Sequence, residues 1–312
     1  MILMALISEF SDSVVCLSFH FIKKVGPIKG RRIINMLSQR TGLIDDYVDA
    51  VMEVSSTSAD ITRKNVIRAL ELADIEIEKA RGLDVQVLPI ISNEYPKKLS
   101  QISDAPLALF LLGNVEALNR SQQVAVVGTR KPSVKGGLSC QRITQTLVEN
   151  GVNIVSGLAL GCDTIAHETC LNAKGITIAV MPCGLDTVAP LSNRDLLNAI
   201  VNSGGTIVSE YPLGIKPSRG NYVQRNRIQS GLSSAVIIIE AGSKSGTMKT
   251  AEYCKIQGRD LYAVNPDTFD VDSDAGGNRD LIDSGVRALN GKDDIQYLIQ
   301  KLDDFSENDL FA

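Results

Sequence analysis

One segment of this 312-residue chain combines the residue types that bind phosphate. The apolar run Val124–Val127 ends in Gly128-Thr129-Arg130, and a helix-length segment follows after Ser133. A glycine turn between a strand and a helix directs backbone N–H groups and the positive helix end toward an anion, which an arginine can bind bidentately. The pattern therefore predicts a phosphate-binding turn, although such turns are also common for packing alone.

Further polar segments lie beside other apolar runs. Ser156-Gly157 ends one run, and Ser245-Gly246-Thr247 leads from the run 235–240 into a helix-length segment. Their hydroxyl and backbone N–H groups are candidate phosphate ligands. Arg225-Asn226-Arg227 stands just before the run 235–240. Two such arginines would be a solvated surface in most proteins, but here they precede the same sheet edge and add to the predicted phosphate site.

Asp163 and His167 are four residues apart, which places them on one face of a helix. Such a pair could act in acid-base chemistry or supply half of a metal site. The structural alternative is that Asp163 caps the helix while His167 fixes it against the sheet. We favour that alternative because no other histidine is near in the sequence, and we predict no catalytic residue, metal site or cofactor.

The composition restricts the class of protein. The chain has 44% apolar residues and a net charge of −4, so any nucleic-acid contact must come from local clusters of Lys and Arg. No apolar run reaches the length of about 20 residues that a membrane helix needs, so we expect a cytoplasmic protein without membrane contact. The six cysteines are scattered without a C-x-x-C pair, which favours buried reduced thiols.

Near-continuous apolar runs alternate with amphipathic segments from residue 85 onward. This alternation predicts a doubly wound α/β domain with a mainly parallel sheet covered on both faces. Ligands bind such sheets beyond the carboxyl ends of the strands, where the segments above stand. The runs expected to be strands are Val85–Ile91, Ala108–Leu112, Val124–Gly128, Ile154–Gly157, Ile176–Met181, Thr206–Ser209, Ala235–Glu240 and Leu261–Val264.

Three divisions of the chain are predicted. Residues 1–82 read as a small all-helical domain, 83–290 as the α/β domain, and 291–312 as a short helix over 293–302 with an acidic tail. Within the first, Lys23–Gly30 loosely resembles a helix-hairpin-helix turn, in which backbone N–H groups meet a DNA phosphate. Its irregular glycine spacing favours a simple turn between helices with solvated lysines.

The ordered series of motifs resembles the DNA-processing protein A family, known as DprA or Smf. The resemblance covers about two thirds of the chain without large gaps. It rests on Glu94-Tyr95-Pro96, Ile102–Pro106, Phe110–Asn114, Val127–Arg130, Ser156–Ala159, Gly161, Asp163, Ala166-His167, Ser209–Pro212, Arg225–Ile228, Gly231–Ser233, Glu240-Ala241, Ser245–Thr247, Thr250-Ala251, Gly277-Asn278 and Leu281-Ile282.

The resemblance implies an extended Rossmann domain preceded by a SAM-like helical domain, forming homodimers and binding single-stranded DNA rather than turning over a substrate. It further implies a role in DNA uptake and recombination, in which the protein loads a RecA-type recombinase onto single-stranded DNA. Gly128 and Arg130 match the DNA-binding turn of the family. We extend this basic pocket to a further four residues, Lys131, Lys135, Arg225 and Arg227.

Several positions depart from the family pattern. Leu160 stands where a basic residue is usual, Ala189-Pro190 replaces Tyr-Pro, and Lys249 replaces an apolar residue. The resemblance implies a member without the C-terminal winged-helix module. These departures leave open a role in phage or plasmid biology, or as a nucleic-acid sensor in phage defence.

Two other functions stay open. Phosphoribohydrolases, which release bases from nucleoside monophosphates, share this Rossmann variant and carry P-G-G-x-G-T-x-x-E. Gly246-Thr247 fits that motif, but Thr250 occupies the position of the acid and Glu252 lies two residues further, on a different helical face. The other alternative is a nucleotide-binding module, because phosphate-binding turns do not show whether a phosphate belongs to a polymer.

Overall fold

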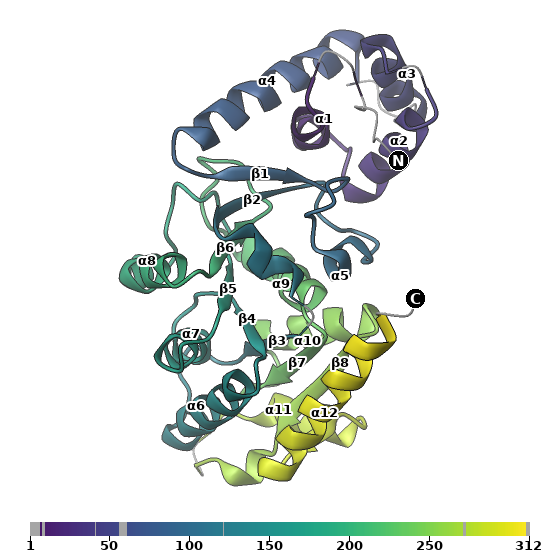
Figure 1. Ribbon diagram of the computed structural model, residues 1–312. Helices are drawn as coiled ribbons and strands as arrows, with labels where there is room; N and C mark the ends of the chain where they lie inside the picture. Colours follow the sequence, from purple (N-terminus) through teal and green to yellow (C-terminus); the bar gives the residue numbers. More distant parts are fainter. Residues whose placement is uncertain are drawn as a thin grey trace.

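The computed structural model describes residues 7, 10–40, 42–55, 61–120, 122–270 and 273–309, with side chains as far as residue 303. Its centre is a nine-stranded sheet in the order β1-β2-β6-β5-β4-β3-β7-β8-β9 (Figure 1). The strands are β1 Gln86–Pro89, β2 Ala108–Gly113, β3 Gln123–Val127, β4 Asn153–Ser156, β5 Thr177–Val180, β6 Thr206–Ser209, β7 Ala235–Ile238, β8 Asp260–Val264 and β9 Arg287–Leu289.

The predicted α/β class and mainly parallel sheet are confirmed. Strands β3 to β9 pair in parallel, whereas β1 pairs with β2, and β2 with β6, in antiparallel fashion. Each of the eight predicted apolar runs overlaps a strand, with bounds that differ by a few residues at most, but β9 was not predicted. Only three residues long and exposed at Arg287, it carries too short an apolar pattern to be recognised.

Helices cover both faces of the parallel part of the sheet. Val124 and Val126 of β3 pack in one cluster with residues of α6, α7 and α12, while Ala125 and Val127 pack in another with residues of α9, α10 and α11. This alternation follows from the two-residue period of a strand. These helices are α6 Val134–Glu149, α7 Cys162–Asn172, α8 Arg194–Asn202, α9 Arg219–Leu232, α10 Gly246–Ile256, α11 Gly276–Asp283 and α12 Lys292–Asp309.

A unit of N-terminal helices sits on the β1–β2 end of the sheet, at the top of Figure 1. Its hydrophobic cluster continues into Leu107, Ala108 and Phe110 around β2. Gly30 is needed for this packing, because a Cβ there would lie 2.1 Å from Leu107 Cδ1. The elements of this part are α1 Asp12–Ser18, η1 Phe19–Phe21, α2 Pro27–Leu37, α3 Ile44–Val54 and α4 Arg63–Arg81, with α5 Lys97–Ser100 following β1.

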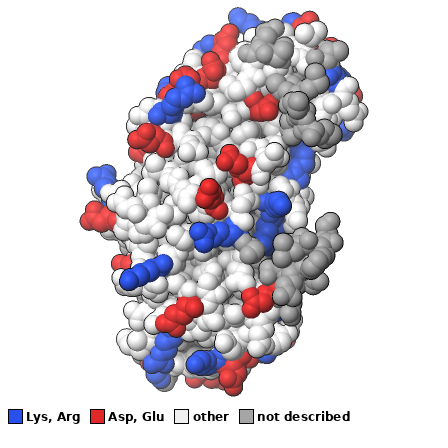
Figure 2. All heavy atoms as spheres, viewed as in Figure 1, with Lys and Arg blue, Asp and Glu red and all other residues white. Residues whose placement is uncertain are grey.

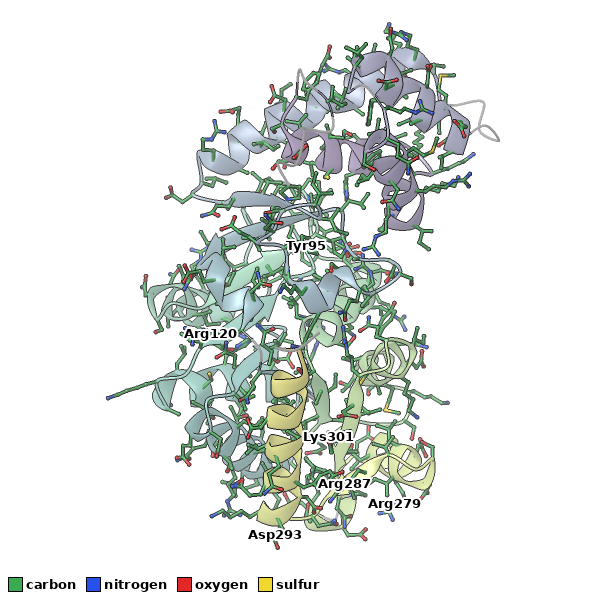
Figure 3. The ribbon with its side chains drawn as sticks, turned by 45° about the vertical axis from the view of Figure 1, so that its right-hand side comes forward. Tyr95, Arg120, Arg279, Arg287, Asp293 and Lys301 are labelled. Carbon is green, nitrogen blue, oxygen red and sulfur yellow. The ribbon has the colours of Figure 1, made fainter. Side chains whose placement is uncertain are left out.

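The C-terminal helix α12 is longer than the predicted 293–302. Ile295, Leu298, Ile299 and Leu302 are buried at helical spacing. They pack in the same hydrophobic cluster as the buried residues of α6. Figure 3 shows α12 in front of the sheet, with Asp293 at its beginning and Lys301 further along it. Lys301 Nζ lies 2.6 Å from the carboxylate of Asp260 in β8. The helix therefore belongs to the core of the α/β part. The acidic tail stays a prediction, because the side chains after residue 303 lie outside the described part.

Among the residues that the structure describes, no helix is long and apolar enough to cross a membrane. All six cysteines are among the described residues, and each is buried and free of disulfides.

Candidate functional site

The predicted phosphate-binding turn lies at the point in the sheet where the order of the strands reverses. Strands β3 and β7 are neighbours, but the chain leaves β3 through α6 toward β4 and leaves β7 through α10 toward β8. The carboxyl ends of such a strand pair form the ligand-binding crevice of doubly wound sheets. Thr129 N–H donates to the carbonyl of Glu240 at 2.7 Å, so the two loops that follow β3 and β7 are joined directly.

Close packing fixes the shape of this turn. A Cβ at Gly128 would lie 2.5 Å from Cys162 Sγ, and one at Gly161 would lie 2.5 Å from the carbonyl of Thr129. The Glu240 carboxylate accepts from both the N–H and the hydroxyl of Ser133 at 2.9 Å. The turn is therefore held in one conformation by the protein itself.

The first N–H groups of α6 are used internally, which changes part of the sequence-based argument. Ser133 N–H binds Glu240, Lys135 N–H donates to Asp270 at 3.0 Å, and Gly136 N–H donates to the Ser133 hydroxyl at 3.0 Å. The start of α10 is more open, because no side chain caps it. The Ser245 hydroxyl is buried there and has no hydrogen-bond partner among the described residues.

Three cations of the turn are exposed: Arg130, Lys131 and Lys135. Arg130 lies with its Cζ 4.8 Å from the ring centroid of Tyr222 in α9, within the range of a cation–π contact. Lys135 lies 3.9 Å from Asp270. On the face seen in Figure 2, blue and red side chains are interspersed, so any anion attraction on that face is local rather than a broad basic field.

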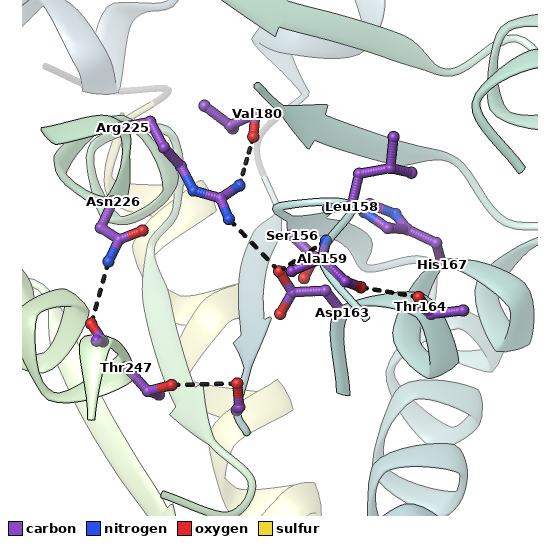
Figure 4. Close-up of polar contacts among 12 residues, drawn as sticks. Ser156, Leu158, Ala159, Asp163, Thr164, His167, Val180, Arg225, Asn226 and Thr247 are labelled. Atoms are coloured by element: carbon purple, nitrogen blue, oxygen red, sulfur yellow. Dashed lines mark hydrogen bonds and ion pairs between the residues drawn. The ribbon is translucent and has the colours of Figure 1, made fainter. Parts of the chain in front are cut away.

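Arg225 differs from these cations because its side chain is buried. Its guanidinium donates to the carbonyl of Val180 and lies 3.7 Å from the Asp163 carboxylate (Figure 4). It also presses against Gly157, where a Cβ would be 1.8 Å from Arg225 Nη1. Gly157 is thus required so that this guanidinium can sit beneath the loop after β4.

Arg227 is also buried and ion-paired. Its Nε lies 3.3 Å from Asp104, and its Nη2 binds Glu210 after β6. Asn226, between the two arginines, donates to the carbonyl of Gly246 at 3.2 Å. These three predicted site residues connect loops of the sheet edge, and their contact with a phosphate stays a prediction.

The remaining predicted residues join the same loops. Thr247 donates through its hydroxyl to the carbonyl of Gly128 at 3.1 Å, which ties the start of α10 to the β3 turn. Ser156 is buried and donates to the carbonyl of Val126 at 2.7 Å. Gly246 is exposed at the start of α10. The structure therefore brings all the predicted residues to one sheet edge, in two groups of different exposure.

His167 and Asp163 have structural partners, as we favoured from the sequence, but the expectation that Asp163 caps the helix was wrong: the N-cap of α7 is Gly161, and no side chain caps it. His167 Nε2 accepts from Leu158 N–H at 3.3 Å, and its Nδ1 lies 2.7 Å from the Thr177 hydroxyl. Because that hydroxyl donates to the carbonyl of Ile154, the Nδ1 of a neutral ring carries the proton. Burial, together with the charge of Arg225, lowers the pKa of His167 to about 3. A proton acceptor of so low a pKa is poorly matched to base catalysis near neutral pH.

Burial also raises the pKa of Asp163, an effect that the Arg225 charge opposes. Asp163 accepts from Ala159 N–H at 3.4 Å, so it holds the loop at the start of α7. No group of three or more His, Cys, Asp or Glu side chains suited to a metal ion occurs among the described residues.

Tyr222 and Glu240 are site residues that the sequence-based list omitted. Tyr222 precedes Arg225 by three residues, and that spacing on a helix predicts neighbouring side chains. Its ring lies 6.0 Å from the Arg225 guanidinium as well as close to that of Arg130. The role of Glu240 could not be seen in the sequence, because it depends on the pairing of β3 with β7.

Comparison with known proteins agrees with this geometry. The family described as DNA recombination-mediator protein A matches residues 86–300. Protein Smf of Synechocystis is 36% identical over 287 residues, covering 89% of this chain and 70% of that protein. DNA processing protein DprA of Streptococcus pneumoniae is 40% identical over 206 residues, covering 66% of this chain and 71% of that protein.

Solved structures give the same result. The X-ray structure of DNA processing protein A from Streptococcus pneumoniae superposes with a TM-score of 0.76 and 29% identity, covering 92% of this chain and 98% of that one. DNA processing protein A from Helicobacter pylori, whose structure was reported for its single-stranded DNA binding mode, gives a TM-score of 0.61 and 31% identity over 70% of this chain and 95% of that one. The resemblance read from the sequence is confirmed, and the chain belongs to the DNA recombination-mediator protein A family of DprA and Smf proteins.

Proposed function

We propose that this protein binds single-stranded DNA across the carboxyl edge of the sheet, with one phosphate between Arg130 and the start of α10. The observation that carries the proposal is the exposed Arg130 side chain held over Tyr222, beside the carboxyl ends of the neighbouring strands β3 and β7. Arginine binds phosphate bidentately, and a helix start favours negative charge. The Ser245 hydroxyl, which has no hydrogen-bond partner among the described residues, stands at that helix start and is a further candidate ligand.

Two observations support a DNA strand, rather than free phosphate, as the ligand of this site. Tyr222 offers an aromatic ring beside the phosphate position, and stacking of a base on such a ring is independent of sequence. The structure of the Helicobacter pylori relative was reported for its single-stranded DNA binding mode. In this arrangement Arg130, Lys131 and Lys135 contact the strand, while Arg225 and Arg227 hold the loops that shape the site.

The test compares affinities of the full chain for a single-stranded oligonucleotide, the duplex of the same sequence and free nucleoside monophosphates. We expect the single strand to bind most tightly. Tyr222→Leu should weaken it by about 1–3 kcal/mol for each stacked base, while the matched Tyr222→Phe keeps the ring and the affinity. Equal binding of duplex and single strand would contradict the preference for a single strand. Equal affinities of the Tyr222→Leu and Tyr222→Phe variants would show that Tyr222 is not a stacking surface.

The recombinase partner and the homodimer are proposals that rest on family membership. We propose that the DNA-bound protein loads a RecA-type recombinase during DNA uptake or recombination. Assembly of the recombinase on an oligonucleotide should then be faster with the protein present. A solution mass near twice 33.6 kDa would support the dimer, and a mass of one chain at micromolar concentration would contradict it.

We further propose that the protein is not an enzyme. Thr250, which stands where phosphoribohydrolases carry an acid, is buried, and Glu252 is exposed and paired with Lys249 at 2.8 Å. The general acid-base step of that reaction has no carboxylate in the matching position. Release of free base from nucleoside monophosphates above the level of a Glu252→Ala control would overturn this proposal.

A further inference from the structure

A cavity lies between the N-terminal helices and the sheet, beside α9. It has a volume of about 340 Å³, within the range of small-molecule sites. Its walls come from η1, the start of α2, the segment before β2, the loop after β6, and α9. Its lining includes Pro27, Pro106, Glu210, Tyr211, Gln224 and Arg227.

One end of this cavity is polar, and one of its hydrogen-bond donors has no acceptor among the described residues. Arg227 is only 4% exposed, and its Nη1 has no hydrogen-bond acceptor among the described residues. A buried donor without an acceptor is costly, so an acceptor on a bound molecule would be favourable there. Gln224 lies three residues before Arg227 on the same helix, and its exposed side chain can both donate and accept.

The walls between the two ends suit a flat ring. Tyr211 is half-buried, and Pro27 and Pro106 add rigid apolar surfaces. The Tyr95 hydroxyl donates to the carbonyl of Pro106 at 2.6 Å, which holds this wall in place. Figure 3 shows Tyr95 at the junction of the helical unit and the sheet.

The other end is the start of α2, an 11-residue helix. Gly26 at its N-cap has no side chain to bind the first N–H groups, and the first turn contains no acidic residue. Pro27 at the first helical position has no N–H, so the groups that can meet an anion are the N–H groups of Ile28 and Lys29, together with the positive helix end. Lys23 and Lys24, both exposed, directly precede this start. At the opposite end the Glu210 carboxylate disfavours an anion, so charge orients the ligand.

We propose that this cavity binds one nucleotide, with the base against Arg227 and Gln224 and the phosphate at the start of α2. Base carbonyl and ring nitrogen atoms are the acceptors that arginine and glutamine side chains recognise. The site does not require a phosphate at Arg130. Its nucleotide can come from a free nucleoside monophosphate or from a strand that runs over α9, because Tyr222 faces Arg130 while Gln224 and Arg227 line the cavity.

The test uses Gly26, where a Cβ would meet nothing within 4 Å and φ is −90°. Asp and Asn are both favoured at an N-cap over Gly, so Gly26→Asp and Gly26→Asn should keep or raise the melting temperature. Only Gly26→Asp brings a carboxylate to the phosphate position. We expect it to weaken nucleotide binding tenfold or more relative to Gly26→Asn.

Calorimetric titration of the full chain with each deoxynucleoside monophosphate, and separately with an oligonucleotide, distinguishes the sources. Weakening of monophosphate binding by Gly26→Asp, with no change in Arg130→Ala, supports a free nucleotide. Absence of monophosphate binding together with weaker oligonucleotide binding by Gly26→Asp supports a nucleotide of a strand. Equal affinities of Gly26→Asp and Gly26→Asn for both probes would overturn the proposal, whatever Arg130→Ala does to strand binding.

Discussion

The β3 turn and helix α9 both bring arginines to the same sheet edge, but they use them differently. Arg130 of the turn is exposed and rests on Tyr222. Arg225 and Arg227 of α9 are each 4% exposed and bind carboxylates and a carbonyl of the protein. The difference indicates that one group of cations is available to a ligand while the other builds the surface on which the ligand rests.

The comparison also explains why a glycine lies against the buried Arg225 guanidinium. A guanidinium beneath a loop needs space at the loop backbone, which Gly157 provides. Substitution of Arg225 should therefore act on folding, and substitutions in the β3 turn should act on strand binding.

The largest effect is expected for Arg225→Ala. Removal of one partner from a buried ion pair leaves an uncompensated charge on Asp163 and costs about 3–5 kcal/mol. Urea denaturation measures the loss. Arg120→Ala, an exposed change before β3 and so at the opposite end of the sheet, serves as the control. A loss below about 1 kcal/mol would mean that Arg225 is not part of the framework.

A smaller loss is expected for Gly157→Ala. Its Cβ would enter the buried Arg225 guanidinium, and overpacking of this kind costs about 1–3 kcal/mol. The matched control is Gly137→Ala in α6, where the nearest atom is Ile165 Cδ1 at 3.5 Å. There the gain in helix propensity should stabilise the protein by about 0.5–1 kcal/mol. Changes of the same sign in both variants would contradict the packing described.

The pH dependence of stability should show the buried, neutral state of His167. Its pKa is about 3 in the folded protein, against the ordinary value of 6.5, so between these values the unfolded chain binds a proton that the folded one does not. Stability is therefore lost as pH falls from 6.5 toward 3, by up to about 1.4 kcal/mol per pH unit from this group.

The measurement is the free energy of unfolding against pH for the wild type and His167→Gln. Burial raises the pKa of Asp163 and of Glu210, and their contributions have the opposite sign, falling as pH rises. The difference between the two proteins isolates His167. Parallel curves for wild type and variant would show that the histidine is not held neutral.

The smallest effect is expected for Leu160→Lys. Leu160 is 48% exposed and precedes Gly161, which touches the backbone of Thr129 and Arg130. A lysine there would add a cation beside the turn without disturbing the core. We expect the plot of log affinity against log salt to steepen by about 0.7 for single-stranded DNA. An unchanged slope would place the strand away from this loop.

The sequence predicted the sheet and the β3 turn because each depends on local pattern. An apolar run followed by glycine and a helix-length segment is contained within a few residues around Gly128. The burial of Arg225 and Arg227 was not predictable, because their partners Asp163, Asp104 and Glu210 come from distant loops. The antiparallel pairing of β1 with β2 was missed for the same reason, as was the use of the α6 N–H groups by Glu240 and Asp270.

The central claim is that Arg130 is a direct phosphate contact. It is tested by the salt dependence of affinity for a single-stranded oligonucleotide, measured for wild type, Arg130→Ala and the control Arg120→Ala. Loss of one phosphate contact should reduce the slope of log affinity against log salt by about 0.7 in Arg130→Ala and leave it unchanged in Arg120→Ala. An Arg130→Ala protein that binds as tightly as the wild type with the same slope would contradict the claim.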